Sequence, residues 1–381
     1  MDAFSALPGA VTDEGVVAHF GDPIREQRGL EAGDALAPLG DRAVIEVSGA
    51  DRLGWLDSIT SQAVARLGVS TSTELLVLDP QGHVEHAAAV VDDGASTWLI
   101  ADRGDAPGLA GWLQRMVFRA DVVVSPRDDL AVLGFFAGGA AERSAEVVAI
   151  APNGSAVVWT DPWPQVQPGG HQYHLGDGHP GARYHWRTAI IDAAGAASLL
   201  GVTAPEGDET TWAGALAAEA LRIAAWRPRW ATEVDDRSIP HETDWIRSAV
   251  HLDKGCYRGQ ETVAKVHFLG HPPRRLAALH LDGSDNVLPA PGDAVVTDGA
   301  EVGRITSSAR HHELGPIALA LLSRRAPAGD VIVRTGDAEV AAAQEVIVPA
   351  DAGATADVPR LTRLSRRPTA PDPRDMDPRD R

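Results

Sequence analysis

"HLDKGCYRGQETVAKVHFLG", residues 251–270, gathers the rare reactive residues of this chain in one short segment. Cys256 is the only cysteine, and Lys254 and Lys265 are the only lysines among 34 basic residues. The compact ammonium of lysine is not interchangeable with the planar guanidinium of arginine. The two lysines therefore indicate selection for a particular shape or chemistry in this segment.

Two glycines frame Cys256. Gly255 and Gly259 permit positive φ or a close backbone approach, and the residues after Gly259 are helix-forming. We therefore expect Cys256 just before a helix N-terminus, beside Lys254 and Arg258. The helix dipole and the two cations would favour the thiolate there. The alternative is a buried, inert cysteine in a tight turn.

Length and composition favour a protein of two or three domains. The chain has 381 residues, 44% of them hydrophobic, and no apolar run approaches the roughly 20 residues that cross a bilayer. Its start, MDAFSALPGAV, lacks the basic flank and long apolar core of a signal peptide. We expect a cytoplasmic protein with no membrane association, and a single cysteine is consistent with a reducing compartment.

The charge is strongly negative but uneven. A formal net charge of −19 repels phosphate backbones, which disfavours direct nucleic-acid binding. Residues 222–275, however, contain ten basic and seven acidic side chains. This electropositive segment is a candidate site for a small anionic ligand, and the alternative is ordinary scatter of surface charge.

Short strands and helices alternate through the first part of the chain, which predicts an α+β fold with mostly antiparallel sheets. We expect an irregular N-terminal arm over 1–30 and a body over 31–271. A long helix capped by Asp208 is predicted over 208–226. The other elements predicted in the body are strands at 43–49, 74–79, 84–91, 97–102, 120–125 and 130–136, and helices at 50–64 and 108–118.

The pattern of residues changes after residue 272. Short apolar strands follow one another, and Asp298-Gly299 is a two-residue hairpin signal. We predict a small antiparallel barrel or sandwich over 272–350. Residues 351–381 are polar and rich in Pro, Arg and Asp, so we expect a disordered tail.

Four histidines lie close together in "HQYHLGDGHPGARYH", residues 171–185. Zinc is conceivable, but no cysteine or regularly spaced carboxylate accompanies them. We expect structural or surface histidines and assign no metal ligand.

"KGCYRGQE" (254–261) resembles the signature of the YgfZ-type folate-binding proteins. These are relatives of the glycine-cleavage T-protein, an aminomethyltransferase, and are implicated in iron–sulfur cluster assembly or repair and in tRNA modification. Similar segments follow the family order over about residues 17–348: FGDPIREQRGL (20–30), VIEVSGADRLGWLDSITSQ (44–62), EALRI (219–223) and GRITSSARHHELGPIALALL (303–322). The resemblance implies an α+β body of antiparallel sheets and helices around a central folate cavity, followed by a C-terminal β-barrel.

The implied ligand is tetrahydrofolate or a derivative. A carboxylate can accept the N–H groups of its pterin ring, aromatic side chains can stack on the ring, and Arg or Lys can pair with its tail carboxylates. Glu85 stands nearest the acidic residue that the transferases carry after an early glycine-rich turn. The candidate catalytic residues are Cys256 and Lys254, and the candidate cofactor-binding residues are Glu85, Trp226, Arg222, Arg258, Tyr257 and Gln260.

The sequence departs from the transferase pattern at one position. Where those relatives continue the helix with Glu-Ala-Gly, this chain has Ala224-Ala225-Trp226. The glutamate that contacts the pterin is therefore missing, and Trp226 could stack on a ligand or pack in the core.

We therefore expect a folate-binding accessory protein for iron–sulfur client proteins, including tRNA-modifying enzymes. One cysteine cannot hold a cluster alone, so Cys256 could be one ligand, a redox-sensitive thiol or a reactant with a client. The alternatives are a tetrahydrofolate-dependent aminomethyl or methyl transferase, and an interaction module without a ligand.

Overall fold

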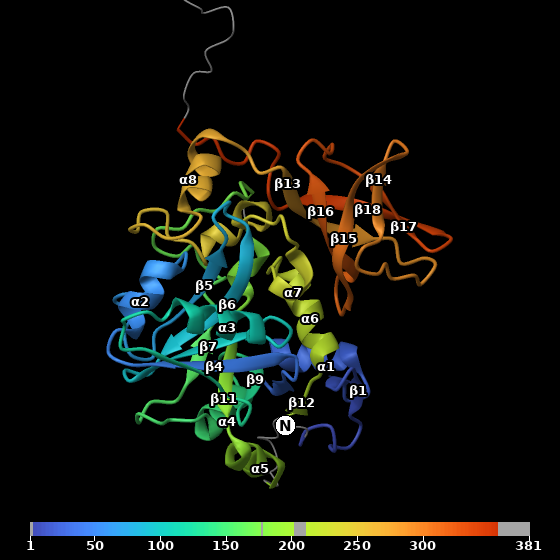
Figure 1. The fold of residues 1–381 in the computed structure, drawn as a ribbon. Helices are drawn as coiled ribbons and strands as arrows, with labels where there is room; N and C mark the ends of the chain where they lie inside the picture. The colour runs from blue at the N-terminus through green and yellow to red at the C-terminus, as the bar shows by residue number, and fades with distance from the viewer. Residues whose placement is uncertain (1–2, 177, 202–210, 357–381) are drawn as a thin grey trace, which may run out of the picture.

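The computed structural model describes residues 3–176, 178–201 and 211–356, which form an α+β body and a separate β-barrel (Figure 1). One sheet of the body is antiparallel throughout, in the order β5(Ser72–Leu78), β6(Val84–Asp92), β7(Ser96–Asp102), β4(Arg42–Ser48) and β8(Val123–Pro126). The other sheet has the order β10(Val158–Thr160), β11(Trp186–Ile191), β9(Ala131–Phe136), β3(Ala35–Pro38) and β12(Thr211–Trp212). Only the short β12–β3 pairing in this second sheet is parallel.

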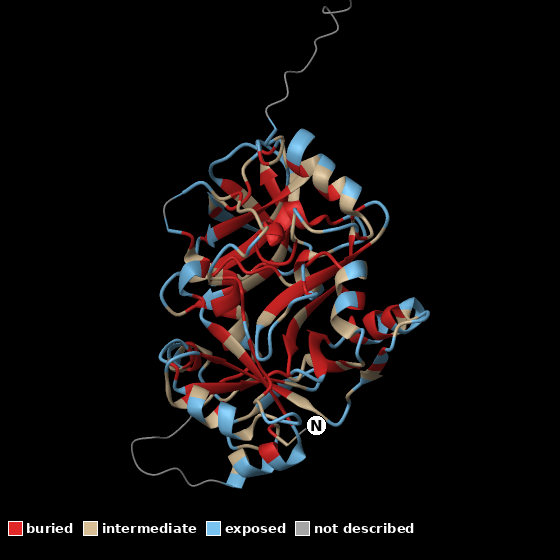
Figure 2. Ribbon diagram, turned by 90° about the vertical axis from the view of Figure 1, so that its left-hand side faces the viewer, coloured by how far each residue is buried: buried red, intermediate tan, exposed pale blue. Residues whose placement is uncertain are grey.

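The two sheets pack face to face, with helices on their outer faces. Alternate residues of a strand face opposite sides: Val44 packs in the core between the sheets, and Ile45 packs in the core beneath the helices. Figure 2 shows the buried strands inside and the exposed helix faces outside. The outer helices are α2(Arg52–Ile59) and α3(Ala106–Met116) on one side, and α4(Ala140–Val148) and α5(Ala193–Gly201) on the other.

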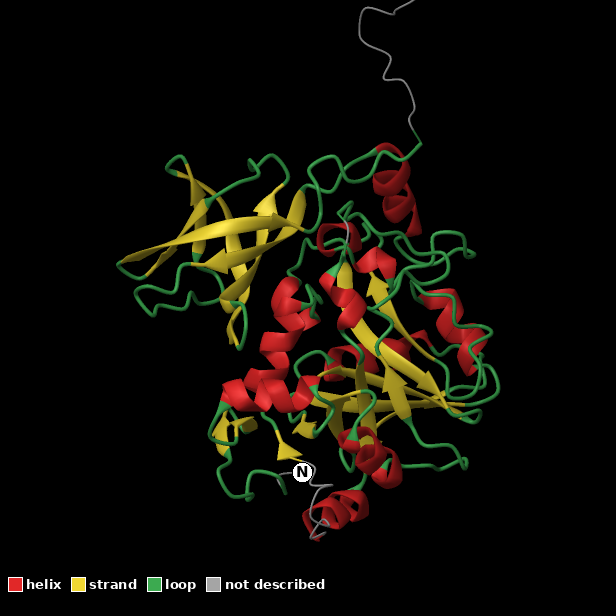
Figure 3. Cartoon of the chain, turned by 180° about the vertical axis from the view of Figure 1, so that it is seen from behind, coloured by secondary structure: helices red, strands yellow, loops and turns green. Residues whose placement is uncertain are grey.

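The C-terminal barrel is closed, which confirms the predicted barrel (Figure 3). Asp298 and Gly299 both have positive φ, 50° and 79°, as a two-residue hairpin turn of type I′ requires. The strands, in their order around the barrel, are β13(Arg274–Leu281), β16(Gly315–Ser323), β15(Ala300–His311), β14(Ala294–Thr297), β17(Val331–Thr335) and β18(Ala338–Val346).

In the described residues, three α-helices and two short 3-10 helices connect the body to the barrel, and a third 3-10 helix precedes β11. α6 packs against both α1 and β15, so it joins the arm, the body and the barrel. These elements are α6(Ala215–Ala224), α7(Trp230–Glu233), α8(Gln260–Leu269), η1(Pro180–Arg183), η2(Pro240–Thr243) and η3(Trp245–Arg247).

The N-terminal arm is more regular than we predicted. It contains a hairpin of β1(Val11–Asp13) and β2(Val16–His19), followed by α1(Pro23–Glu31). Asp22 caps α1 by accepting the backbone N–H groups of Ile24 and Arg25, and Pro23 occupies the first helical turn. The sequence Asp-Pro was therefore a helix-start signal that our irregular assignment overlooked.

The predicted helix over 208–226 is shorter than expected. α6 begins at Ala215, and Gly214 before it lies so close to β2 that a Cβ there would stand 2.3 Å from the Ala18 carbonyl oxygen. Asp208, the predicted cap, lies outside the described residues, as do residues 357–381 of the predicted tail. No helix in the described part of the chain is both long and apolar enough to cross a membrane.

Candidate functional site

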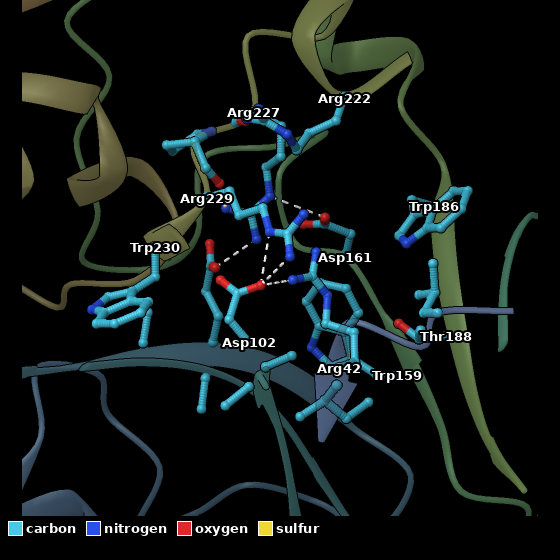
Figure 4. A pocket seen from close by; sticks show the side chains of 18 of the residues that line it. Arg42, Asp102, Trp159, Asp161, Trp186, Thr188, Arg222, Arg227, Arg229 and Trp230 are labelled. Carbon is cyan, nitrogen blue, oxygen red and sulfur yellow. Dashed lines mark hydrogen bonds and ion pairs between the residues drawn. The ribbon is translucent and has the colours of Figure 1, made fainter. Parts of the chain in front are cut away.

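A cavity of about 110 Å³ lies between the two body sheets, walled by β6 and β7 on one side and by β10 and β11 on the other. We call it the central cavity (Figure 4). The chain that leaves α6 covers it with Arg227, Arg229 and Trp230. Its aromatic walls are Trp159, Tyr184, Trp186, Trp230 and Trp245.

One ion cluster of the central cavity centres on Arg227. Its guanidinium donates to Glu74 Oε2 at 2.6 Å and to Asp161 Oδ2 at 3.0 Å. Glu74 Oε2 also accepts the Trp245 indole N–H at 3.0 Å. Glu74 Oε1 is buried and has no hydrogen-bond partner among the residues described. Glu74 thus lines the cavity and keeps one carboxylate oxygen that can still accept a hydrogen bond.

Burial dominates the electrostatics of this cluster. It raises the pKa of Asp161 to about 6, with Glu74 raising it further and Arg227 opposing. A buried carboxylate loses hydration, and a second carboxylate nearby makes its charged form less favourable. Arg227 opposes this rise and favours the charged form of Asp161.

A second ion cluster ties the central cavity to the first sheet, where β7 ends and β4 begins. Arg229 Nε donates to Asp102 Oδ1 at 2.7 Å, and Arg42 pairs with the same carboxylate. Arg229 also lies 2.7 Å from Asp41. Burial lowers the pKa of Arg42 to about 10, with Arg229 adding to this effect. Arg227 and Arg229 of the electropositive segment are therefore both paired with carboxylates.

Arg222, a predicted cofactor-binding residue, lines the central cavity but binds protein acceptors through each of its nitrogens. It pairs with Glu219 at 2.6 Å and with Glu233 at 2.9 Å. It also donates to Ser307 on β15 at 2.9 Å and to the Arg227 carbonyl. These contacts hold the end of α6 against α7 and the barrel.

Trp226 lies at the turn that follows α6. Its φ is 57°, in the left-handed region that favours glycine, at the position where the transferases carry glycine. Its ring is buried and makes edge contacts with His174 and His179, whose centroids lie 5.0 and 5.2 Å away. Trp226 and Ala224 line a second cavity, of about 480 Å³, between body and barrel. We call it the body–barrel cavity; it shares Tyr184 with the central cavity.

Cys256 is exposed on the loop before α8 and lines neither of these two cavities. The cations beside it in sequence are bound elsewhere. Lys254 donates to the carbonyls of Asp57, Thr60 and Gln62, the last two at 2.9 and 2.8 Å, and its side chain is only 4% exposed. Burial lowers the pKa of Lys254 to about 8, with Asp57 opposing.

These contacts account for the choice of lysine at position 254. An ammonium has three donors around one point and meets three carbonyls at the end of α2, whereas a planar guanidinium spreads its donors. Lys254 therefore positions the loop of Cys256 on α2. Lys265 is exposed on α8.

Arg258 pairs with Glu85, at 2.8 Å between Nη1 and Oε2. The backbone carbonyl of Glu85 in turn accepts the indole N–H of Trp230 at 3.0 Å, and Trp230 lines the central cavity. Glu85 itself does not line that cavity. A short chain of contacts thus connects the loop of Cys256 to the cavity wall.

Tyr257 and Gln260 anchor the other end of the loop. The Tyr257 ring is buried in the core shared with the barrel, and burial raises the pKa of its phenol. The Lys254 ammonium lies 5.3 Å from the centroid of this ring. Gln260 Oε1 accepts the backbone N–H of Tyr257 at 3.3 Å. Both side chains therefore shape the loop.

The two glycines that frame Cys256 differ in importance. Gly259 has a φ of 82° and packs on the turn between β5 and β6, so a Cβ there would lie 2.6 Å from the Asp79 carbonyl oxygen. A Cβ on Gly255 would meet nothing within 4 Å. Only Gly259 is required by backbone conformation and space.

The four histidines of 171–185 do not converge. His171 contacts His267 and Tyr173, while His174 and His179 contact Trp226. Burial lowers the pKa of His179 to about 3, with Arg247 adding to the effect. His185 is exposed.

The structure thus places Cys256, Lys254, Tyr257, Arg258 and Gln260 at the loop before α8, with Glu85 bound to Arg258, and it places Arg222 and Trp226 at the end of α6. Sequence reasoning missed Glu74, Asp161 and Arg227. One signal for Glu74 was present, because it is the single charged residue in the strand "STELLVL", residues 72–78.

Comparisons with known proteins agree with this architecture. The family model of the glycine cleavage T-protein C-terminal barrel domain matches residues 274–353. The glycine cleavage system aminomethyltransferase T of Bartonella henselae superposes with a TM-score of 0.70 over 91% of this chain and 96% of its own, at 14% identity.

Two curated relatives match over most of the chain. A putative chloroplastic transferase of Arabidopsis thaliana is 25% identical over 315 residues, which are 81% of this chain and 69% of the relative. The tRNA-modifying protein YgfZ of Yersinia enterocolitica is 26% identical over 274 residues, 72% of this chain and 78% of the relative. The fold is that of the glycine cleavage aminomethyltransferase, and the barrel matches the C-terminal barrel domain of that protein class. Over most of its length the chain is similar to YgfZ-type proteins.

Proposed function

We propose that this protein binds tetrahydrofolate or a derivative in the cytoplasm and assists the assembly or repair of iron–sulfur clusters in client enzymes, including tRNA-modifying ones. The observation that carries the folate part is Glu74 Oε1, a buried carboxylate oxygen with no partner among the described residues, on an aromatic-lined cavity. A pterin ring offers N–H donors to such an oxygen and a flat face to the aromatic walls.

The volumes of the two cavities indicate how a whole folate molecule would be bound. The central cavity, at about 110 Å³, is smaller than the roughly 300–1,000 Å³ of typical ligand sites. The body–barrel cavity, at about 480 Å³, lies in that range and presents Arg183, a cation for a tail carboxylate. We assign the ring to Glu74 and the tail to Arg183, with the ligand passing beside Tyr184, which lines both cavities.

Calorimetric titration with tetrahydrofolate tests this assignment. Glu74→Gln keeps the shape of the side chain but removes its charge, and we expect affinity to fall about tenfold or more because a charged acceptor is lost. Glu85→Gln is the matched control, since Glu85 lies outside the cavity and pairs with Arg258. Absence of binding to the wild type contradicts the folate proposal; equal affinity in Glu74→Gln contradicts only the assignment of the ring.

The iron–sulfur part rests on the exposed thiol and on the relatives named tRNA-modifying proteins. Deleting the gene should lower the activity of an iron–sulfur tRNA methylthiolase under oxidative stress. Reintroducing the wild-type gene should restore that activity, and Cys256→Ser should not. Undiminished methylthiolase activity in the deletion strain would remove this part of the proposal.

A transferase is the second candidate, because one relative is named a putative transferase and the superposed structure is an aminomethyltransferase. Ala224 argues against a transferase. It stands where the transferases carry a carboxylate, and without that carboxylate the side chains that would orient the reactants are incomplete. The assay is turnover of glycine with tetrahydrofolate and a lipoylated partner protein. We expect no turnover, and sustained turnover would establish the transferase.

A further inference from the structure

Three side chains with metal-binding atoms meet where the N-terminal arm touches the barrel. Glu31 is the last residue of α1, His311 ends β15, and His312 follows in the turn. One ligand atom from each lies within 4.8 Å of the others. Within the described residues this is the group of histidine, cysteine and carboxylate side chains that converges at metal-binding distance.

The convergence of the two histidines depends on the end of the strand. Consecutive residues of a strand point to opposite faces. Because β15 ends at His311, the turn brings the ring of His312 back to the same side, and the two ring centroids lie 4.6 Å apart. His312 Nε2 lies 2.7 Å from Glu31 Oε2, so the carboxylate completes the group.

Half-buried hydrogen bonds hold α1 and the end of β15 in register. Gln27 lies one helical turn before Glu31, on the same face of α1. Its Oε1 accepts the backbone N–H of His312, and its Nε2 donates to the carbonyl of Arg310, both at 2.9 Å. His311 Nδ1 accepts two backbone N–H groups at 3.2 Å, the long limit for such bonds, so its ring is oriented but weakly held.

We propose that Glu31, His311 and His312 bind one Zn²⁺ ion, with an open coordination position toward the body–barrel cavity. Two imidazoles and one carboxylate are a ligand set of zinc sites that keep a fourth position for water or substrate. Glu31 and His311 line that cavity, which supplies both an entry path and an open side. The proposal does not depend on folate binding.

The ligand atoms must shift for the ion to enter, because they are spread over up to 4.8 Å and one pair is in hydrogen-bond contact. The 2.7 Å contact between His312 and Glu31 is that of a hydrogen-bonded pair, and ligand atoms around a tetrahedral zinc ion lie about 3.3 Å apart. Opening the pair by less than about 1 Å makes room for the metal, and the neutral imidazole of His312 then carries its proton on Nδ1 and offers the Nε2 lone pair. Bound zinc would then fasten the arm to the barrel.

The test uses the full chain without an affinity tag, in a Cys256→Ser background so that the thiol contributes no binding. Zinc sulfate is titrated by calorimetry, and cobalt chloride is added in parallel to observe the visible absorption of low-coordinate Co²⁺. We expect one ion per chain. His312→Gln, which can still hydrogen-bond Glu31, should weaken zinc binding by more than the roughly 10–100-fold that changes around a metal's ligands cause.

His280→Gln is the matched control. His280 also lines the body–barrel cavity and pairs with a carboxylate, Glu345, at 3.3 Å, but no third ligand joins it among the residues that the structure describes. Its zinc affinity should equal that of the parent protein within about twofold, the scatter of such titrations. Zinc should also raise the melting temperature of the parent and of His280→Gln, but not that of His312→Gln.

Two outcomes overturn the site: binding of less than one zinc ion per chain, and unchanged affinity in His312→Gln. If His312→Gln proves unfolded by circular dichroism, Glu31→Gln decides, because Glu31 is exposed and its loss does not disturb a core. A weakened affinity in that variant supports the site, and an unchanged one overturns it.

Discussion

The central cavity and the loop of Cys256 contrast in how their charges are held. In the cavity, Arg227 and its acidic partners are buried, and they come from three distant segments. In the loop, Cys256 is exposed, and Arg258 pairs with Glu85 while both side chains stay about one third exposed. Rare residues close in sequence marked the loop, whereas the folding of distant segments makes the cavity.

This contrast changes the interpretation of the electropositive segment. Residues 222–275 looked like a place for an anionic ligand, yet Arg227 and Arg229 are matched by carboxylates of the first sheet and of residue 161. Their charge therefore serves the interior of the body. The group that remains available to a ligand is an acidic one, the Glu74 carboxylate, whose Oε1 has no partner among the described residues.

The largest expected effect separates the buried cluster from an ordinary ion pair. Arg227→Met leaves Glu74 and Asp161 buried without their cation, which should lower the free energy of unfolding by about 3–5 kcal/mol. Arg237→Ala is the control, because its pair with Asp236 is more than 80% exposed on both sides. Its effect should stay within about 0.5 kcal/mol. Urea unfolding measures both, and similar values for the two variants would contradict the role of Arg227.

The next effect depends on pH and concerns Asp244, which precedes the Trp245 that binds Glu74. Asp244 Oδ1 accepts the backbone N–H of Tyr173 at 2.8 Å, while its Oδ2 is buried with no partner among the described residues. Burial raises the pKa of Asp244 to about 7, against the opposing effects of Tyr173 and Arg247. The folded state therefore holds this proton more tightly than the unfolded state.

The stability of the folded protein therefore depends on pH through Asp244. Since the folded pKa lies above the unfolded value of 3.8, the wild type loses stability as pH rises from about 4 to 7. Asp244→Asn lacks this titration, so it should match the wild type at the acid end and exceed it above pH 7 by on the order of 4 kcal/mol. Urea unfolding of both proteins across this range is the measurement; a constant difference would show that Asp244 is ionised throughout.

Local signals explain what could be predicted from the sequence. The hairpin at Asp298-Gly299 and the loop before α8 depend on neighbouring residues, and both were recognised. The partner of Arg227 at Glu74 is 153 residues away, and the carbonyls that bind Lys254 lie more than 190 residues away. No local pattern encodes those pairings, so Lys254 was interpreted as catalytic although its contacts position the loop.

The two glycines beside Cys256 give a smaller effect within the loop itself. Gly259→Ala places a side chain at positive φ against the Asp79 carbonyl, so it should cost about 2 kcal/mol or more. Gly255→Ala enters open space and should be neutral or slightly stabilising. Thermal unfolding of the pair measures this. Equal losses would mean that the loop adapts, and that its shape is not set by the contact with the β5–β6 turn.

The smallest effect on stability is expected where the effect on function should be greatest. Cys256→Ser replaces an exposed thiol, so unfolding should change by less than about 0.5 kcal/mol. In the cell, the same variant should fail to support iron–sulfur enzymes that the wild type supports. A large loss of stability would place the sulfur in the core, against the structure. Full support by a stable Cys256→Ser protein would show that the loop acts through its shape and its link to Glu85, and that the thiol takes no part.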